Sequence, residues 1–264
     1  TREQHIRRDK ATSNICTAQV LLAVVAAAYA VWHGPTGLTR IARQVTDRAH
    51  QLASALRAAG LDVADQQFFD TIRIRTKGGA KELWNRAREG GYTLDLVDGD
   101  ILQISVDETV TDDELRELTQ LLGGSTDEIR GPVDKAWPED LRRTSSFMTH
   151  PVFSSYHTET TMMRYLKRLA DRDYGLDRGM IPLGSCTMKL NAAAEMEAMT
   201  WPAFSQMHPF APVEDQAGSL RLIRDLEIWL AELTGYDTVS LQPNAGSQGE
   251  YTGLAAIRGY HVSR

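Results

Sequence analysis

Apolar residues recur every three or four positions in two stretches near the start of the chain. Residues 11–32 predict a helix that Thr12 or Ser13 caps and that Gly34-Pro35 ends. A second helix is predicted from Leu38 to Ala59, with Gly60 ending it. Its apolar positions are Leu38, Ile41, Val45, Ala49, Leu52 and Leu56.

The apolar pattern then changes to a period of two, which is typical of strands. TIRIRT (71–76) places two isoleucines on one face and two arginines on the other. After a short helix over 80–88, YTLDLV (92–97) and ILQISV (101–106) flank Asp98-Gly99, a strong hairpin signal. Thr111 and Glu114 form a capping-box pattern at the start of DELRELTQLL. Residues 1–122 therefore predict a small α+β domain.

Residues 123–146 are rich in Gly, Pro, Ser and charge without periodicity, and we interpret 123–150 as a linker. Organised patterns resume after it, over residues 151–264. Helices are predicted at 158–171, 215–234 and 250–261, and TVSLQP (238–243) predicts a strand. A strand followed by a helix indicates the beginning of an α/β domain, so the fold class expected for the whole chain is α/β.

Composition limits the classes of partner. The 264 residues carry a formal net charge of -6, which argues against nucleic acid, because phosphate binding needs an excess of Lys and Arg. The most apolar run, 19–32, is shorter than the ~20 residues that cross a membrane. Two distant cysteines, Cys16 and Cys186, favour a reducing compartment. With no initiator Met and no signal peptide, the chain is expected to be an internal piece of a longer polypeptide.

NAGSQG (244–249) lies where the predicted strand gives way to the predicted helix. Its glycines allow a ligand to approach the backbone, and the N–H groups at a helix start attract anions. A phosphate-binding turn is one interpretation, and a tight strand–helix connection without a ligand is the other. The pattern around Ser247 also resembles a hydrolase nucleophile elbow. Only His261 and Glu250 follow it, so the chain cannot complete the required triad.

A second polar segment, IPLGSCTMKLN (181–191), contains Ser185, Cys186, Thr187 and Lys189. It fails the spacing of a P-loop. Cys186 would need a paired base to act as a nucleophile, and a buried inert thiol is an equally open interpretation. His208, between apolar residues and prolines, could line a pocket or pack structurally.

The sequence offers no metal motif. The seven histidines are scattered, and neither cysteine has a C-x-x-C partner. His157 and Glu159 form the H-x-E of zinc deaminases, but the P-C-x-x-C that must accompany it is missing.

Four long strings resemble one family, the decarboxylating glycine dehydrogenases, or P-proteins of the glycine cleavage system. They are TREQHIRRDKATSNICTAQ (1–19), HTETTMMRYLKRLADRDYGLDRGMIPLGSCTMKLN (157–191), HPFAPVEDQ (208–216) and LQPNAGSQGEYTGL (241–254). The resemblance implies a fold-type I pyridoxal-phosphate enzyme made of two related halves. On that map residues 1–122 close the first, non-catalytic half, 123–150 link the halves, and 151–264 begin the cofactor-binding half.

The resemblance also implies the reaction: glycine is decarboxylated with pyridoxal 5'-phosphate, and the aminomethyl group passes to the lipoyl arm of H-protein. It assigns Gly246, Ser247 and Gln248 to the phosphate cradle. Ser185, Cys186, Thr187, Lys189 and His208 would line the substrate pocket. A homodimer is expected of the full-length enzyme.

One departure from the family pattern limits the expected activity. The cofactor-bearing lysine of the family lies in a His-Lys motif followed by a glycine-rich run, and no such string occurs here. Lys189 stands in a different motif and is not nominated, so the chain is expected to be inactive alone. The alternatives are a non-catalytic scaffold or interaction segment, and a serine hydrolase built on Ser247. Abundant Arg and Ala suggest a bacterial, cytoplasmic protein; a eukaryotic member would be mitochondrial.

Overall fold

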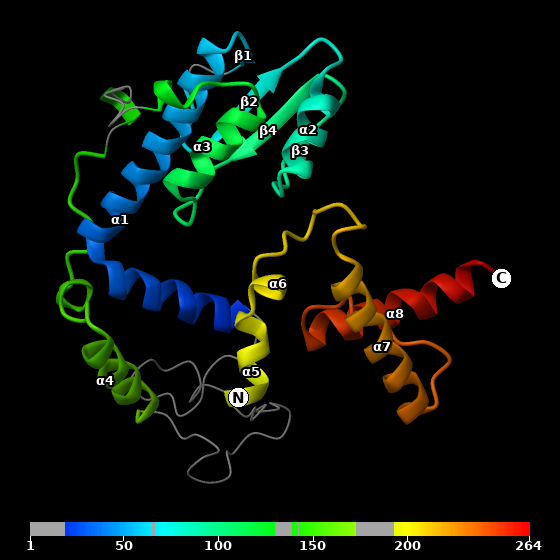
Figure 1. Cartoon of the computed structure of the whole chain (residues 1–264). Coiled ribbons are helices and arrows are strands. Elements are labelled where there is room, and N and C mark those ends of the chain that lie inside the picture. The colour runs from blue at the N-terminus through cyan, green and yellow to red at the C-terminus, as the bar shows by residue number, and fades with distance from the viewer. Residues whose placement is uncertain (1–18, 65–66, 130–138, 142, 173–192) are drawn as a thin grey trace. The chain divides into compact units, whose positions relative to one another are not determined.

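The computed structural model describes residues 19–64, 67–129, 139–141, 143–172 and 193–264 (Figure 1). These form two units, which are described separately. One unit comprises Tyr29–Thr158, and the other comprises the described residues before Tyr29 and from Glu159 onward. The predicted boundaries at 122 and 150 stay a prediction.

The first helix, α1 (Gln19–Ala58), combines the two helices predicted from the sequence. Gly34 interrupts it with φ 61° and ψ 179°, a conformation that only glycine adopts readily, and Pro35 follows. The sequence therefore located the break correctly. The second arm ends where predicted, because Gly60 takes a positive φ of 86° directly after the helix.

An antiparallel sheet of order β1-β2-β4-β3 follows. Its strands are β1 (Asp62–Val63), β2 (Thr71–Arg75), β3 (Asp95–Leu96) and β4 (Ile101–Ser105). The central pair aligns Ile72 with Ile104 and Ile74 with Leu102. The predicted β3–β4 hairpin is confirmed. The short edge strand β1 was not predicted, because two residues give no periodic signal.

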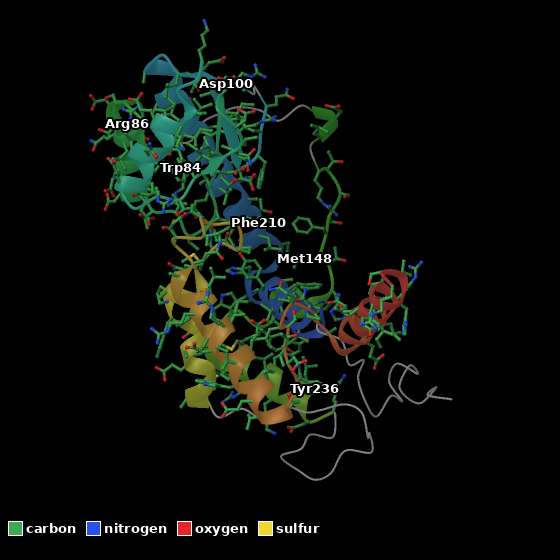
Figure 2. The ribbon with its side chains drawn as sticks, turned by 90° about the vertical axis from the view of Figure 1, so that its right-hand side faces the viewer. Trp84, Arg86, Asp100, Met148, Phe210 and Tyr236 are labelled. Carbon is green, nitrogen blue, oxygen red and sulfur yellow. The ribbon has the colours of Figure 1, made fainter. Side chains whose placement is uncertain are left out.

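Helices α2 (Ala80–Glu89) and α3 (Asp112–Leu121) complete this unit's core together with the second arm of α1. Ile72 and Ile74 are fully buried, whereas the alternating Arg73 and Arg75 are exposed. One face of the sheet is therefore covered by helices and the other faces solvent. Trp84 of α2, labelled in Figure 2, donates from its ring nitrogen to the carbonyl oxygen of Leu94 at 3.0 Å.

Between α3 and α4, the residues that the structure describes form three short 3-10 turns: η3 (Thr126–Glu128), η4 (Glu139–Leu141) and η5 (Pro151–Ser154). The last turn packs against the break in α1. The Nδ1 atom of His157 lies 2.6 Å from the carbonyl oxygen of Trp32. His157, considered above for its H-x-E pattern, thus has a structural contact inside the unit.

The second unit is helical in its described part. It contains α4 (Glu159–Ala170), α5 (Ala193–Glu197), η6 (Ala198–Thr200), α6 (Pro202–Ser205), α7 (Ala217–Thr234) and α8 (Gly246–Val262). Helices α4, α7 and α8 were predicted. The short helices α5 and α6 were missed, because four or five residues are too few to show a period of 3.6.

The strand predicted over 238–243 is wrong: these residues form neither helix nor strand. A strand requires a neighbour to share its ladder, and no described residue pairs with this segment. The backbone N–H of Leu241 instead donates to the carboxylate of Glu227 in α7, at 3.3 Å.

Leucine and isoleucine side chains recur along α7 at helical spacing, and the described residues do not bury them. Leu220, Ile223 and Leu226 remain 36–40% exposed, and Leu233 is 82% exposed. The described structure is thus a mixture of helices with one small antiparallel sheet.

Candidate functional site

The predicted phosphate cradle lies in the first turn of α8, not in a turn before it. The helix begins at Gly246, four residues earlier than the pattern suggested, and Ala245 precedes it in an extended conformation with φ -150° and ψ 161°. The backbone N–H groups of Gly246, Ser247 and Gln248 are therefore the first three of the helix. These groups have no carbonyl partner one turn earlier.

Nothing in the described part of the chain caps these three N–H groups. Ala245 has no side chain that could accept a hydrogen bond, and none is made at this position. Ser, Thr, Asp or Asn is the usual residue here, because its oxygen satisfies one of the free donors. The first donation within the helix comes from Gly249, whose N–H bonds to the carbonyl oxygen of Ala245 at 2.9 Å.

The side chain of Gln248 folds back over the turn. Its Oε1 accepts a hydrogen bond from the backbone N–H of Asn244 at 2.9 Å. Gln248 thereby fixes the approach to the helix, while its own backbone N–H stays directed along the helix axis.

Access and charge both suit an anion at this helix start. Gly246, Ser247 and Gln248 are exposed, and a methyl group added at Gly246 or Gly249 would meet no atom within 4 Å. The first turn of α8 contains no acidic residue. The partial positive charge of the helix end is thus not offset locally.

His208 lies in a loop that its own ring organises. Its Nδ1 accepts a hydrogen bond from the backbone N–H of Phe210 at 3.1 Å. An accepting Nδ1 in a neutral ring leaves the proton on Nε2, which is then a donor. The Gln216 side chain donates to the carbonyl oxygens of Pro209 and Ala211, which fastens the loop to the start of α7. Phe210, labelled in Figure 2, is 90% exposed.

The other predicted pocket residues, Ser185, Cys186, Thr187 and Lys189, lie outside the described residues. Their assignment to a substrate pocket with His208 stays a prediction.

The geometry of α8 argues against the serine hydrolase. Ser247 and His261 lie at opposite ends of this helix. Fourteen residues at 1.5 Å each separate them by about 21 Å along the axis, far beyond hydrogen-bond reach. Glu250, three residues after Ser247, is likewise too far from His261 to orient it as a catalytic base.

No helix among the described residues is both long and apolar enough to cross a bilayer. No group of three or more His, Cys, Asp or Glu side chains in the described ranges is arranged to hold a metal ion.

One cavity was missed by the sequence interpretation. It lies within the sheet unit and has a volume of about 820 Å³. The signal that could have found it is the spacing of Arg40, Arg43 and Asp47, which places polar groups on one face of the second arm of α1.

A helix start with free N–H groups in an exposed segment has the donors that an anion requires. Comparison with known proteins identifies the family. Residues 1–122 match the family model described as Glycine cleavage system P-protein. The whole chain is 98% identical, over 264 residues, to glycine dehydrogenase (decarboxylating) of Cutibacterium acnes. It is 55% identical, over 266 aligned residues, to the protein of that name in Xanthomonas axonopodis pv. citri.

The chain therefore belongs to the family of glycine cleavage system P-proteins, and the resemblance seen in the sequence is confirmed. It spans 27% of the length of each of these two relatives.

Proposed function

We propose that this chain is part of a pyridoxal-phosphate-dependent glycine decarboxylase, the P-protein of a glycine cleavage system. The observation that carries the proposal is the alignment of the whole chain with curated glycine dehydrogenases. The finer fold, a fold-type I transferase with a small domain over 1–122, a linker over 123–150 and a cofactor-binding domain beginning at 151, is part of this proposal.

The residues of α8 fit the phosphate group of the cofactor. A phosphate needs several N–H donors that converge on open space, and the first turn of α8 has three such donors and no capping side chain. The hydroxyl of Ser247, an exposed residue, adds a further donor. Gly246, Ser247 and Gln248 are therefore proposed to hold the phosphate.

When bound, pyridoxal phosphate supplies an electron sink for the electrons released as carbon dioxide leaves. The residues of this chain hold and orient the ligands. The backbone N–H groups of Gly246–Gln248 neutralise the phosphate charge, and Gln248 fixes the loop that leads to them. His208 presents Nε2–H, which suits the carboxylate of glycine.

Ser185, Cys186, Thr187 and Lys189 are proposed to line the same substrate pocket. The partners of the full enzyme are then glycine and the lipoyl arm of H-protein, with a second copy in a homodimer. The bacterial relatives support a cytoplasmic location. Because the His-Lys string of the family is missing from this sequence, the chain alone is proposed to be inactive.

The experiment is glycine–bicarbonate exchange with labelled bicarbonate, in the presence and absence of lipoylated H-protein. A full-length protein containing this stretch should exchange label into glycine only when H-protein is added. The 264-residue chain should exchange none under the same conditions. Exchange by the short chain, or none by a cofactor-loaded full-length protein, would contradict the proposal.

A non-catalytic interaction segment is the second candidate. The exposed apolar side chains of α7, which include Trp229 at 59% exposure, favour it, because such a face usually meets another protein surface. The exchange assay separates the two candidates, since a scaffold has no exchange activity in any length of chain.

A further inference from the structure

The cavity in the sheet unit is formed by segments far apart in the sequence. Most of its wall is the second arm of α1, and the rest comes from the start of α3 and from the segment after it. At about 820 Å³ it lies within the range of small-molecule sites.

The cavity has an excess of positive charge in a chain whose net charge is negative. Four guanidinium groups line it, against the two carboxylates of Asp47 and Asp112, which leaves a net charge of +2. The whole chain carries -6. An anionic ligand is therefore favoured there over a cationic one.

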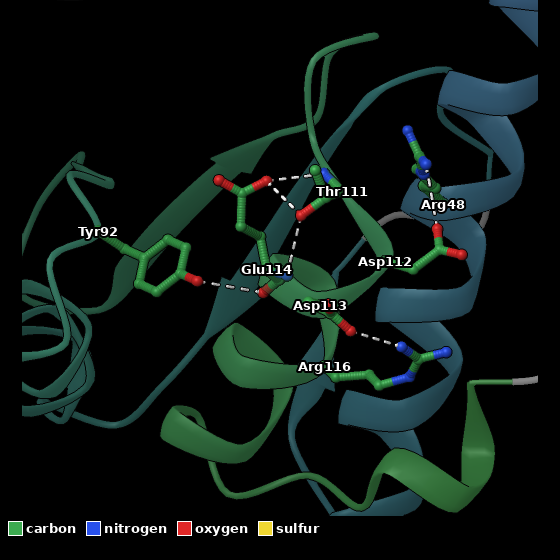
Figure 3. A network of polar contacts seen from close by, with 7 residues as sticks. All are labelled: Arg48, Tyr92, Thr111, Asp112, Asp113, Glu114 and Arg116. Atoms are coloured by element: carbon green, nitrogen blue, oxygen red, sulfur yellow. Dashed lines mark hydrogen bonds and ion pairs between the residues drawn. The ribbon is translucent and has the colours of Figure 1, made fainter.

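One arginine of the cavity, the half-buried Arg48, is already paired with a carboxylate. The Arg48 side chain is 15% exposed and donates to Asp112 Oδ1 at 3.0 Å (Figure 3). With its amide oxygen turned toward Arg48, Gln44 accepts from the same guanidinium at 2.6 and 3.1 Å. Arg116 is likewise engaged by Asp113, at 2.9 Å. Arg48 and Arg116 thus each already have a carboxylate partner within the protein.

Arg40 and Arg43 differ from these two arginines. Both are exposed, and neither forms an ion pair with any residue that the structure describes. They lie one turn apart on the same helix face, so their guanidinium groups reach the same side of the cavity. Paired guanidinium groups are the preferred protein ligands for phosphate and carboxylate.

The remaining wall includes two apolar side chains. Ile129 and Phe147 line the cavity and are half-buried. The guanidinium of Arg143 lies 4.9 Å from the centroid of the Phe147 ring, which restrains that ring. A ligand that fills the cavity therefore meets charge on the α1 side and apolar surface on the other.

We propose that this cavity binds a small organic anion, whose phosphate or carboxylate groups are held by Arg40 and Arg43 and whose ring lies against Ile129 and Phe147. This site is independent of the proposed pyridoxal phosphate cradle on α8. It requires neither the cofactor nor the decarboxylase activity.

The test is isothermal titration calorimetry of the 264-residue chain with ADP and with inorganic pyrophosphate. ADP carries a ring and pyrophosphate does not. We expect saturable binding of one ADP per chain, weaker binding of pyrophosphate, and a loss of affinity with added salt. The double variant Arg40→Gln, Arg43→Gln should weaken ADP binding by about tenfold or more, because two charge-assisted contacts are lost.

Matched variants distinguish binding in this cavity from general electrostatic attraction. Arg73→Gln, Arg75→Gln removes the same charge from the exposed face of β2 and should leave ADP affinity unchanged. Phe147→Ala should weaken ADP without affecting pyrophosphate. Circular dichroism and urea unfolding check that each variant is folded.

Three results would overturn the proposal. One is the absence of saturable heat with either anion. Another is an equal loss of affinity in the two arginine double variants, which would indicate general electrostatic attraction. The third is equal affinity for ADP and pyrophosphate with no effect of Phe147→Ala, which would leave no role for the apolar wall.

Discussion

The Gln248 side chain accepts a hydrogen bond from the backbone N–H of Asn244, 2.9 Å away, across the start of α8. This contact satisfies a donor outside the helix and leaves the first three N–H groups of the helix without a capping side chain. A helix start normally places a Ser, Thr, Asp or Asn side chain over those groups. The exposed donors are the physical basis for proposing a phosphate there.

Gly246→Pro tests the cradle directly. Proline is favoured at the first helical position, and the extended Ala245 before it suits proline, so the helix should remain intact. The substitution removes one N–H donor. In the full-length protein, the affinity for pyridoxal phosphate should fall by about tenfold, as measured by titrating the cofactor's absorbance.

Gly249→Ala is the matched control for that measurement. The N–H of Gly249 already bonds to the carbonyl oxygen of Ala245, and a methyl group there meets no atom within 4 Å. Its cofactor affinity should match that of the unsubstituted protein. Equal weakening by both substitutions would point to helix destabilisation and remove the support for the cradle.

The sheet unit was largely predictable because its elements have strong local signals. The alternation of Ile72 and Ile74 with arginines located β2, and Asp98-Gly99 located the hairpin. Gly34 and Gly60 located the break and the end of α1, since both adopt a positive φ. In each case a few neighbouring residues determine the structure.

The features that were predicted wrongly or missed depend on more than their local sequence pattern. TVSLQP has the composition of a strand, but a strand forms only beside another strand, and its local sequence cannot supply one. The start of α8 was misplaced by four residues because two glycines weaken the helical pattern. The basic cavity escaped prediction because its walls come from α1, α3 and Phe147, and periodicity along one segment does not reveal such a meeting.

Gly34→Ala should destabilise the sheet unit more than an ordinary helix substitution. The backbone at Gly34 has φ 61° and ψ 179°, and an added Cβ would lie 2.4 Å from the carbonyl oxygen of Phe153. Strain and clash together should cost about 2–4 kcal/mol of unfolding free energy, measured by urea denaturation.

Gly60→Ala separates the cost of the backbone strain from the cost of the steric clash. Gly60 also has a positive φ, but a methyl group there meets nothing within 4 Å. Only the conformational cost of about 1 kcal/mol should remain. Equal losses at the two positions would show that the contact with Phe153 does not constrain the break in α1.

The capping box of α3 is expected to contribute measurably to the stability of the same unit. Thr111 Oγ1 accepts from the N–H of Glu114 at 3.2 Å, and Glu114 Oε2 accepts from the N–H of Thr111 at 2.7 Å (Figure 3). Thr111→Ala should lower the unfolding free energy by about 1 kcal/mol. Thr111→Ser, which keeps the hydroxyl that accepts from the N–H of Glu114, is the matched control and should retain most of this stability; a loss equal to that of Thr111→Ala would argue against the box.

The same box predicts a dependence on pH. The hydrogen bonds from the Thr111 backbone and then its hydroxyl hold the pKa of Glu114 below its usual value. Because the folded pKa is the lower one, this stabilisation is complete above the ordinary pKa of 4.5 and is lost as the pH falls below it. Glu114→Gln should therefore reduce the loss of stability between neutral and acidic pH. A hydrogen bond from the Thr109 hydroxyl also lowers the pKa of Asp107. In Glu114→Gln, the contribution of Asp107 to the loss of stability in acid should therefore remain.

Tyr92 has the opposite pH behaviour, at the basic end of the range. Burial raises its pKa to about 12, and the hydrogen bond from its hydroxyl to Glu117 Oε2, at 2.8 Å, adds to the effect. Since the folded pKa exceeds the ordinary value of 10.0, the stabilisation is complete below that value and disappears as the pH rises through the folded pKa.

The measurement is the ultraviolet absorbance of phenolate during a titration with base, compared between the unsubstituted chain and Tyr92→Phe. The difference should show one tyrosine that ionises near 12. Glu117→Gln should lower that pKa only in part, because burial is the larger cause and the ring still packs against the core. A difference titration centred on the ordinary tyrosine range would mean that the Tyr92 ring is not packed against the core and bonded to α3 in solution.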